Sequence, residues 1–293
     1  MKYRIGFIIS VLLILCILTT GCGQTSAGVE SGISLRTVRF CFIKQLLSES
    51  PQGSSGIQEY NYSAGTGFIV NNDGYVITAN HLLEMGKQFV QQSPADNKKV
   101  LIFVPSPPDR SDKFPQIRAT MVNDFAVIAQ DEKHDLALLK INLTGQNAPI
   151  LFQTIHGFVF PQGTPMTLSF GNASLSLNIS KGAAIAATGY STAGQGTLTG
   201  NVTSGELTNV NNFVLTDATG LAVSSLSIPY SISDYYQTDI ISNTLFSGSP
   251  VYSPQNGAIM GMCINIPNSS GKTAVIPGKY ILDLLKSNGV SIK

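Results

Sequence analysis

The sequence predicts an all-β protein made of two barrels, with one short helix near the C-terminal end. Short apolar runs alternate with clusters of glycine, proline, asparagine and aspartate from about residue 33 onward, as in barrels and sandwiches. These runs fall into two sets on either side of roughly residue 150. The 293 residues are 43% hydrophobic and only 12% charged, with 28 glycines and 14 prolines, a composition that favours strands and turns and excludes a disordered chain.

The first set predicts a barrel over about residues 33–150. Residues 37–43 form its first expected strand. The stretch GTGFIVNNDGYVITANHLL predicts a strand, an Asn-Asp-Gly turn, a second strand and a short helical turn. Further strands are expected in KKVLIFVPS, ATMVNDFAVIAQ and LALLKINL. The stretch EMGKQFVQQSPADNKK is interpreted as a solvated surface loop.

The second set predicts a barrel over about residues 151–293. Its expected strands lie in PMTLSFGN, GAAIAATGY, SPVYS and AIMGMCINI. The segment 192–236 is rich in glycine, serine and threonine, and we interpret it as a loop region without an assigned role. A helical period occurs only in GKYILDLLKSNG, where Asn-Gly can end the helix. Four of its residues share one apolar face: Tyr280, Ile281, Leu284 and Leu285.

The first 21 residues have the pattern of an export signal. A basic start, MKYR, precedes an apolar run that is too short to span a bilayer, and small residues follow it. The ending Leu-Thr-Thr-Gly-Cys resembles a bacterial lipoprotein box, which implies cleavage before Cys22 and a lipid on its thiol. We therefore expect an exported protein, lipid-anchored to the bacterial cell membrane at its extracytoplasmic face or in the periplasm, with residues 22–32 as a tether. An ordinary signal peptide with a chance cysteine is the alternative.

Charge and cysteine content argue against several classes of function. The net charge is +1 and no basic stripe occurs, so no nucleic-acid partner is expected. Three histidines and the lack of CxxC pairs give no basis for a metal site, and no cofactor is expected. Apart from the signal segment and Cys22, only Cys41 and Cys263 remain, and these either form a disulfide or stay as two buried thiols.

Three polar residues are candidates for acyl-transfer chemistry: His81 after a strand, Asp135 before a strand, and Ser247 in a Ser-Gly-Ser-Pro turn. Hydrolysis of a peptide bond needs a hydroxyl that attacks, an imidazole that carries the proton, and a carboxylate that orients the imidazole. The three residues are 54 and 112 positions apart, so only the fold can bring them together. Taken singly, each has an ordinary structural explanation.

Around these residues the chain resembles the chymotrypsin-like serine peptidases, most closely their bacterial HtrA/Deg branch. Residues 65–81, GTGFIVNNDGYVITANH, are similar to the strand pair that leads to the catalytic histidine, and HDLALLK is similar to the aspartate motif. Gly-Asn at 171–172 with residues 180–189, Gln-Thr-Asp at 237–239 and Ala-Val-Ile-Pro at 274–277 match later elements in the same order. The resemblance covers roughly residues 33–293 and implies two six-stranded barrels before the short helix. Because the chain stops at Lys293 directly after this helix, no PDZ domain is expected.

The resemblance implies a role for each candidate. Ser247 attacks the scissile carbonyl, His81 acts as general base and then general acid, and Asp135 orients His81. Two competitors receive no role: His134 is expected to face solvent, and Ser249 is expected to enter a strand because Pro250 follows it. The third histidine, His156, lies in the link between the barrels without a motif.

The chain departs from the family directly before Ser247. The family has Gly-Asn-Ser-Gly-Gly-Pro, where this chain has Leu245-Phe246-Ser247-Gly248-Ser249-Pro250. The resemblance assigns the oxyanion hole to the backbone N–H groups of Leu245 and Ser247. A leucine keeps the N–H group but resists backbone conformations that glycine accepts, and loss of one such donor costs about 10²–10³ in rate.

Two functions follow from these observations. The first is a membrane-anchored serine endopeptidase that hydrolyses peptide bonds of exported or misfolded proteins, with polypeptides as substrates. The alternative is a catalytically impaired homologue that uses the same cleft to bind peptides or proteins. The specificity pocket is expected between residues 260–265 and the loop before Ser247, which supply no acidic group. A preference for basic side chains is therefore not expected, and small or aliphatic side chains fit better.

Overall fold

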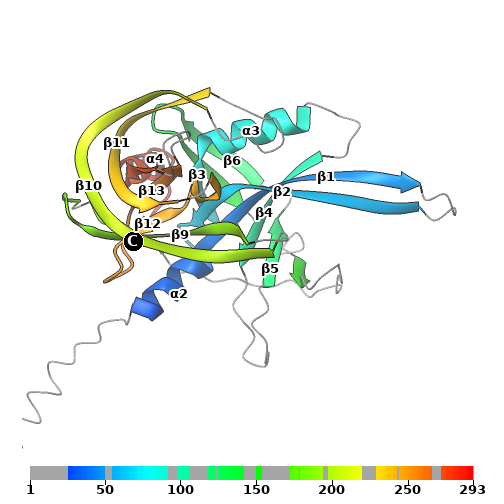
Figure 1. Ribbon diagram of the computed structural model, residues 1–293, viewed down its shortest axis with the longest axis horizontal. Coiled ribbons are helices and arrows are strands. Elements are labelled where there is room, and N and C mark those ends of the chain that lie inside the picture. Colours follow the sequence, from blue (N-terminus) through cyan, green and yellow to red (C-terminus); the bar gives the residue numbers. More distant parts are fainter. Residues whose placement is uncertain are drawn as a thin grey trace, which may run out of the picture.

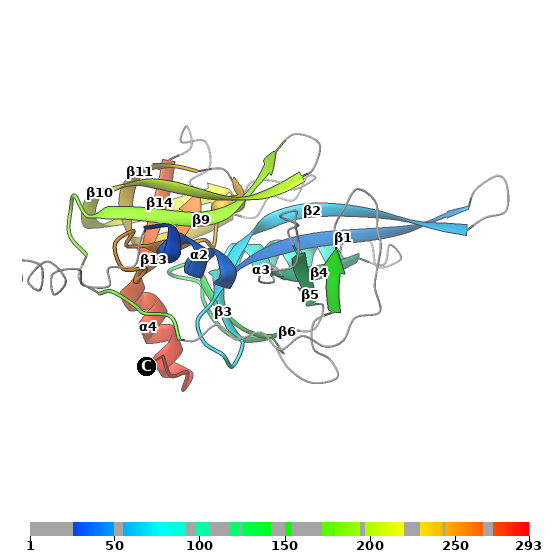
Figure 2. The same ribbon diagram turned by 90° about the horizontal axis from the view of Figure 1, so that it is seen from below.

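The strands form two neighbouring bodies, one from each half of the chain (Figure 2). The structure is a computed structural model and describes residues 26–49, 55–91, 98–105, 118–122, 125–141, 150–153, 172–177, 179–193, 197–219, 229–242, 244–265 and 272–292. The chain is mostly strand, with a closed barrel in its second half and a short helix near its C-terminal end. The predicted all-β, chymotrypsin-like architecture is confirmed.

The first half forms one antiparallel sheet with the order β6-β7-β3-β2-β1-β4-β5-β8. Its strands are β1 (Thr37–Glu49), β2 (Ser55–Ile69), β3 (Tyr75–Ala79), β4 (Lys98–Pro105), β5 (Arg118–Val122), β6 (Phe125–Asp131), β7 (Leu136–Ile141) and β8 (Ile150–Gln153). The β1–β2 ribbon is long, and its outer end projects beyond the rest of the molecule (Figure 1). The predicted hairpin is the β2–β3 pair, in which Gly67 faces Thr78.

The second half closes into a six-stranded barrel with the order β10-β11-β14-β13-β12-β9. Its strands are β9 (Ala184–Ala193), β10 (Thr197–Thr219), β11 (Pro229–Ile241), β12 (Pro250–Tyr252), β13 (Ile259–Asn265) and β14 (Lys272–Pro277). The segment interpreted as a loop region at 192–236 is instead largely the β10–β11 pair. In residues 202–207 more exposed and less exposed positions alternate, which is the period of a strand with one face toward the barrel.

Three described helices accompany the sheets: α2 (Ser26–Arg36), α3 (Asn80–Gln91) and α4 (Gly278–Ser287). The predicted C-terminal helix is α4, which buries Ile281, Leu284 and Leu285. No described helix is long and apolar enough to cross a membrane.

The sequence pattern does not predict the full length of the other two helices, and the interpretation of a surface loop at α3 is wrong. The chain is helical from Ser26, within the segment expected to be a tether over 22–32, because Val29 and Ile33 are spaced one turn apart and both are buried. The surface loop expected after His81 begins as helix α3, where Met85 and Phe89 have the same spacing and pack into the core. Residues 1–25, which include Cys22, lie outside the described part.

Candidate active site

His81 lies where the central strand of the first sheet becomes a helix. Strand β3 is paired on both sides, with β2 and with β7, so its end is held firmly. Helix α3 starts at Asn80, which places His81 in its first turn. The His81 side chain is buried. The short hydrophobic strand β3 thus places the imidazole directly after the end of an interior strand of the sheet.

Asp135 lies in the turn between β6 and β7 and binds His81 twice. Its Oδ2 is 2.6 Å from Nδ1 of the imidazole, and its Oδ1 accepts the backbone N–H of His81 at 2.7 Å. The backbone carbonyl of Asp135 also accepts the N–H of Asn80 at 3.0 Å. Asp135 has a φ of 53°, the left-handed region that residues with a Cβ seldom adopt. These bonds hold both the carboxylate and its strained backbone in place.

Ser247 reaches the site on a loop of the second barrel that contacts β2 directly. Its carbonyl accepts the N–H of Thr66 at 2.9 Å. Gly248 follows with a φ of 90°, and a Cβ there would overlap the Thr66 carbonyl. That carbonyl also accepts the Thr78 hydroxyl at 2.7 Å, two residues before α3 begins. The structure therefore brings the loop of Ser247 to the strand pair that ends at His81.

Thr66 is a residue of β2 that contacts the Ser247 loop, and the sequence motifs assign it no role of its own. It is fully buried, and its hydroxyl donates to the Leu245 carbonyl at 2.6 Å while its N–H donates to the Ser247 carbonyl. Its place between two glycines is the signal that could have identified it. Thr66 fixes the Ser247 loop from the side of the first sheet.

Leu245 lies within a short 3₁₀ helix, Thr244–Phe246, directly before Ser247. Both Leu245 and Phe246 are buried. A 3₁₀ helix is closed by hydrogen bonds from an N–H to the carbonyl three residues earlier. The N–H groups that follow, of Gly248 and Ser249, donate to the carbonyls of Cys263 and Phe246 at 2.8 and 2.9 Å.

Asn265, at the end of β13, is a second contact of Ser247. Its backbone N–H donates to the Ser247 Oγ at 3.2 Å. Its side-chain Nδ2 donates to the Ser242 carbonyl at 2.9 Å, and the Ser242 hydroxyl lies 2.8 Å from that of Thr273. All four residues are buried. The residues bonded around the candidate nucleophile on this side are thus polar and uncharged.

The structure describes two of the three residues that competed with His81 and Ser247 for a catalytic role. The prediction that His134 faces solvent is wrong, because only 7% of the residue is exposed and its ring contacts Asp131 and Tyr280. Ser249 is fully buried directly before β12. His156 lies outside the described residues.

Cys263 is free and buried, so it forms no disulfide with Cys41. Burial raises the pKa of its thiol to about 12, against the opposing effect of hydrogen bonds with Ser242 and Thr273. In the part of the chain that the structure describes, no group of three or more His, Cys, Asp or Glu side chains could hold a metal ion.

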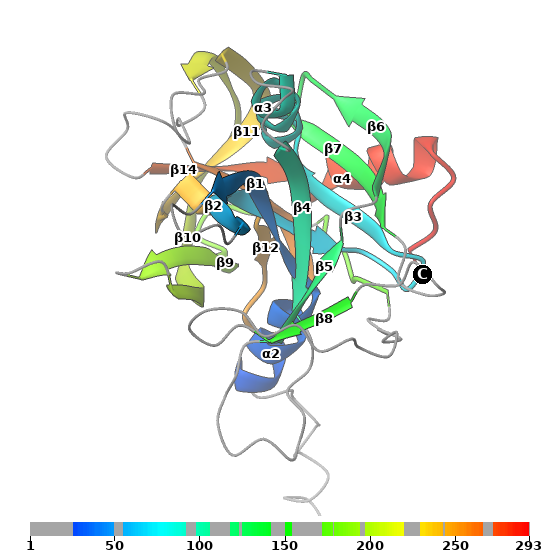
Figure 3. The same ribbon diagram turned by 90° about the vertical axis from the view of Figure 1, so that its right-hand side faces the viewer.

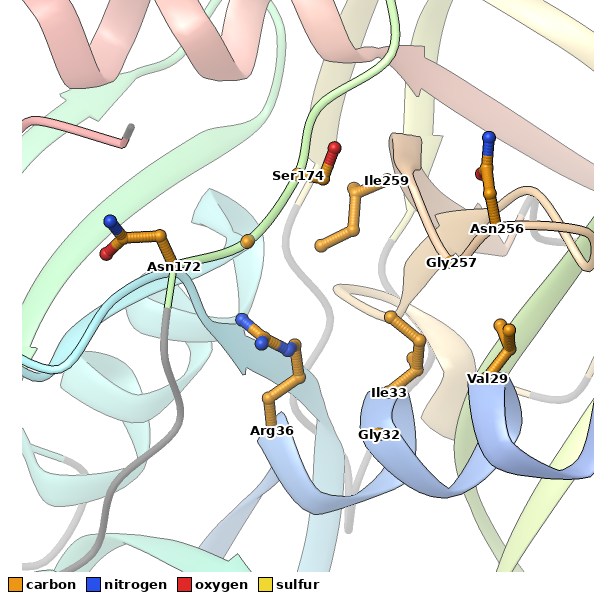
Figure 4. Close-up of a pocket in the computed structure, with 10 residues that line it drawn as sticks. Val29, Gly32, Ile33, Arg36, Asn172, Ser174, Asn256, Gly257 and Ile259 are labelled. Carbon is orange, nitrogen blue, oxygen red and sulfur yellow. The ribbon is translucent and has the colours of Figure 1, made fainter. Parts of the chain in front are cut away.

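A pocket of about 260 Å³ lies between α2 and the turn that joins β12 to β13 (Figure 4). Arg36 enters it from α2 and donates to the Ile69 carbonyl at 3.1 Å. Its other labelled residues are Val29, Gly32, Ile33, Asn172, Ser174, Asn256, Gly257 and Ile259. None of its lining residues is a histidine, a cysteine or a carboxylate, so the pocket offers no acid–base pair comparable to that of His81 and Asp135.

Comparison with known proteins agrees with this geometry. No curated protein matches the chain in sequence. Among solved structures, the HtrA-type protease AlgW with a decapeptide has 19% identity and a TM-score of 0.52, with 90% of this chain and 67% of that chain covered. The MamO protease domain from Magnetospirillum magneticum has 19% identity and a TM-score of 0.50, with 87% of this chain and 98% of that chain covered. At such identities the likeness shows the fold alone.

A match to a family model identifies the family of the chain. A model described as the trypsin-like peptidase domain matches residues 65–262, which is more than half of the chain. The matched range contains His81, Asp135 and Ser247. The chain therefore belongs to the trypsin-like peptidase domain family.

Proposed function

We propose that the protein is a serine endopeptidase that uses Ser247, His81 and Asp135 as its catalytic triad. The observation that carries this proposal is the doubly bonded His81–Asp135 pair, buried beside the loop of Ser247. Because Nδ1 of His81 is bonded to the carboxylate, we assign Nε2 as the nitrogen that accepts the proton of the serine hydroxyl. The chemistry is then acyl transfer to Ser247, followed by hydrolysis.

The proposed steps use the side chains of Ser247, His81 and Asp135. His81 accepts the Ser247 proton as the hydroxyl attacks the carbonyl carbon, and Asp135 stabilises the imidazolium that forms. The proton passes to the leaving amine, and water then releases the acyl group by the same route in reverse. The Asn265 N–H, which donates to the Ser247 Oγ, holds the hydroxyl oxygen at a defined position before substrate enters.

The oxyanion hole is the step at which this chain differs from its family. We propose that the N–H groups of Leu245 and Ser247 bind the developing oxyanion after the 3₁₀ helix Thr244–Phe246 rearranges. The rearrangement is proposed because the 3₁₀ conformation around Leu245 differs from the glycine-like backbone that the family's sequence favours at this position. Substrate binding must supply the free energy for it, which makes the enzyme slow with short or weakly bound substrates.

Substrates are expected to carry a small or aliphatic side chain next to the scissile bond. The side chain of Asn265 is bonded to Ser242 beside the nucleophile. No carboxylate belongs to this group of residues, so a basic side chain would find no counter-charge. Peptide libraries that vary this position should favour alanine or valine over arginine, and a preference for arginine would contradict the assignment.

The location of the enzyme follows from the N-terminal sequence. We propose that the protein is exported and held at the membrane by a lipid on Cys22, acting on exported or misfolded polypeptides. Cys22→Ser should move the protein from the membrane fraction to the soluble extracytoplasmic fraction. Retention of the Cys22→Ser protein at the membrane would contradict lipid anchoring without affecting the peptidase proposal.

The direct test of the activity is cleavage of an unstructured protein such as casein. The purified protein should cleave it, and Ser247→Ala should lower kcat by about 10⁶-fold, because removal of the nucleophile disables the whole triad. Ser249→Ala is the matched control, since Ser249 lies two residues away and is fully buried. Equal cleavage by the Ser247→Ala protein would assign the activity to another residue or to a contaminant.

A second candidate function is peptide binding without cleavage. It is favoured by Leu245 in the place of the family's glycine and by the 3₁₀ helix around it. A fluorophosphonate probe separates the two functions, because it labels only an activated serine. Stoichiometric labelling of Ser247 supports the peptidase, whereas peptide binding with no labelling supports the second candidate.

A further inference from the structure

The turn between β6 and β7, residues 132–135, contacts the second barrel at a place that the proposed chemistry does not use. The N–H of Ser233, on β11, donates to the Lys133 carbonyl at 2.9 Å. The ammonium group of Lys133 lies 3.4 Å from Oδ2 of Asp234. Asp234 has a φ of 59°, so this contact joins two residues with a left-handed backbone, because Asp135 shares that conformation. The turn that carries the catalytic carboxylate is therefore attached to the other half of the molecule.

His134 lies at the centre of this contact. Its Nδ1 is 2.6 Å from Oδ2 of Asp131, and its backbone N–H donates to the other carboxylate oxygen at 3.2 Å. Its Nε2 lies 3.6 Å from Oδ2 of Asp234. The ring stacks on Tyr280 with centroids 3.7 Å apart and planes inclined by 16°. Side chains of β6, β11 and α4 thus surround one buried imidazole, and α4 runs beside β7 (Figure 3).

The charges around His134 favour this arrangement. Although desolvation opposes the shift, hydrogen bonds from Tyr280 and Lys133 and the charge of Lys133 lower the pKa of the Asp234 carboxyl. Asp234 is therefore an anion at neutral pH and faces Nε2 of His134. Lys279 lies over the outer part of the group, 4.5 Å from the centroid of the Tyr280 ring.

The residue after His134 needs such support. Asp135 must aim one carboxylate oxygen at the His81 ring and the other at the His81 backbone, and its left-handed backbone is unfavourable for a residue with a Cβ. Strained conformations persist only where the surroundings determine them from several sides. Because one peptide bond joins Asp135 to His134, fixing the His134 ring and N–H also fixes the direction of Asp135.

We infer that His134 is a positioning residue, which holds the turn of Asp135 against the second barrel and thereby aims the carboxylate at His81. This inference rests on the proposed peptidase function. His134 touches neither substrate nor the reacting atoms, and its effect passes through Asp135. The first sheet and the second barrel must be correctly docked for the contact with Asp234 and Tyr280 to form, so the same residue links the docking of the two halves to the acid–base pair.

Turnover by His134→Ala tests the inference. A misplaced catalytic group of this kind costs about 10- to 100-fold in kcat, and KM should change by less than about twofold because uniform substrate binding is untouched. His134→Asn should recover part of the loss, since its amide can occupy the position of Nδ1 beside Asp131. Glu132→Gln is the matched control on the same turn: its side chain is exposed, and it should retain the kcat of the unaltered protein.

A second readout does not require turnover. The Nδ1 proton of His81, shared with Asp135, gives a far-downfield proton NMR signal that reports their geometry. This signal should shift or broaden in His134→Ala and return toward its original position in His134→Asn. The signal can be recorded even if the protein binds peptides without cleaving them. Failure of the proposed peptidase function can therefore be distinguished from failure of the inference about His134.

The inference is overturned if His134→Ala folds, leaves the His81 signal unaltered and, where peptidase activity is measurable, has the same kcat as the unaltered protein. Should His134→Ala fail to fold, Asp131→Asn provides the same comparison. Asp131→Asn removes the carboxylate that binds Nδ1 of His134 while preserving the shape of the side chain. The His81 signal and kcat should then change in the direction expected for His134→Ala. No change in Asp131→Asn would equally overturn the inference.

Discussion

The two halves of the candidate site differ in how completely they are assembled. On the side of the first sheet, Asp135 binds both the ring and the backbone of His81, at 2.6 and 2.7 Å. On the side of the second barrel, Ser247 is anchored by Thr66, while the residues before it form a 3₁₀ helix that contains Leu245. The acid–base pair is thus formed in the structure, whereas we propose that the oxyanion donors become available only after the 3₁₀ helix rearranges. We therefore propose that the oxyanion hole sets the main limit on the rate.

Apart from removal of the nucleophile in Ser247→Ala, the largest change should come from breaking the His81–Asp135 pair. Asp135→Asn presents an amide to Nδ1 of His81 and favours the wrong tautomer, which should lower kcat by about 10⁴-fold. The kcat measured on a peptide substrate, with circular dichroism to establish folding, checks this expectation. Glu132→Gln serves as control, and a loss of less than about tenfold in Asp135→Asn would show that His81 works without its carboxylate.

A substitution in the loop of Ser247 should mainly change the free energy of unfolding. Gly248→Ala forces a Cβ into the Thr66 carbonyl at a positive φ, so the free energy of unfolding should fall by about 3 kcal/mol. Gly182→Ala is the matched control: it shares a positive φ but has no atom within 4 Å of the added Cβ, and it should lose only about 1 kcal/mol. Urea unfolding measures both, and equal losses would mean that the Thr66 contact contributes nothing.

The motifs around the triad were predictable because they are local. Each lies in a short run of strand or turn residues, and six such runs in order identified the architecture. The burial of His134 was not predictable in this way. The alternation of a strand would place it opposite Asp135, but residues 132–135 form a turn and the positive φ of Asp135 breaks the alternation. The contact with Tyr280, almost 150 positions later, has no local signal.

Other differences have similar causes. Helix α3 extends beyond the expected surface loop because Met85 and Phe89 pack into a core that local composition does not reveal. The Asn265 contact with Ser247 depends on how β13 ends beside the nucleophile loop, which only the closed barrel determines. Contacts between residues far apart in the sequence therefore determine these features, which the local sequence pattern does not predict.

A smaller effect is expected at Cys263, behind Ser242. With a pKa of about 12, its thiol is almost entirely protonated at pH 8 and should not react with a thiol probe in the folded protein. In a protein that starts at Ser26 and carries Cys41→Ser, Cys263 is the single cysteine. Labelling should then appear only on unfolding, and rapid labelling of the folded protein would contradict the packing around Ser242.

The same thiol has a consequence for stability at alkaline pH. Its folded-state pKa is raised above the ordinary thiol value, so its contribution to stability is complete below that value. The contribution should be lost as the pH rises from the ordinary value of about 8.5 toward the folded value. Thermal unfolding between these limits measures the loss, and Cys263→Ala should lack this part of the pH dependence.

The difference between the two halves is tested most directly by the rate at which a fluorophosphonate labels Ser247 in the unaltered protein and in Leu245→Gly. This reaction needs the acid–base pair and the oxyanion donors, but no specific substrate. If the donors limit the rate, glycine at this position should raise the second-order rate constant by about 10²–10³. Equal rate constants for the two proteins would contradict the conclusion that the oxyanion half limits the site.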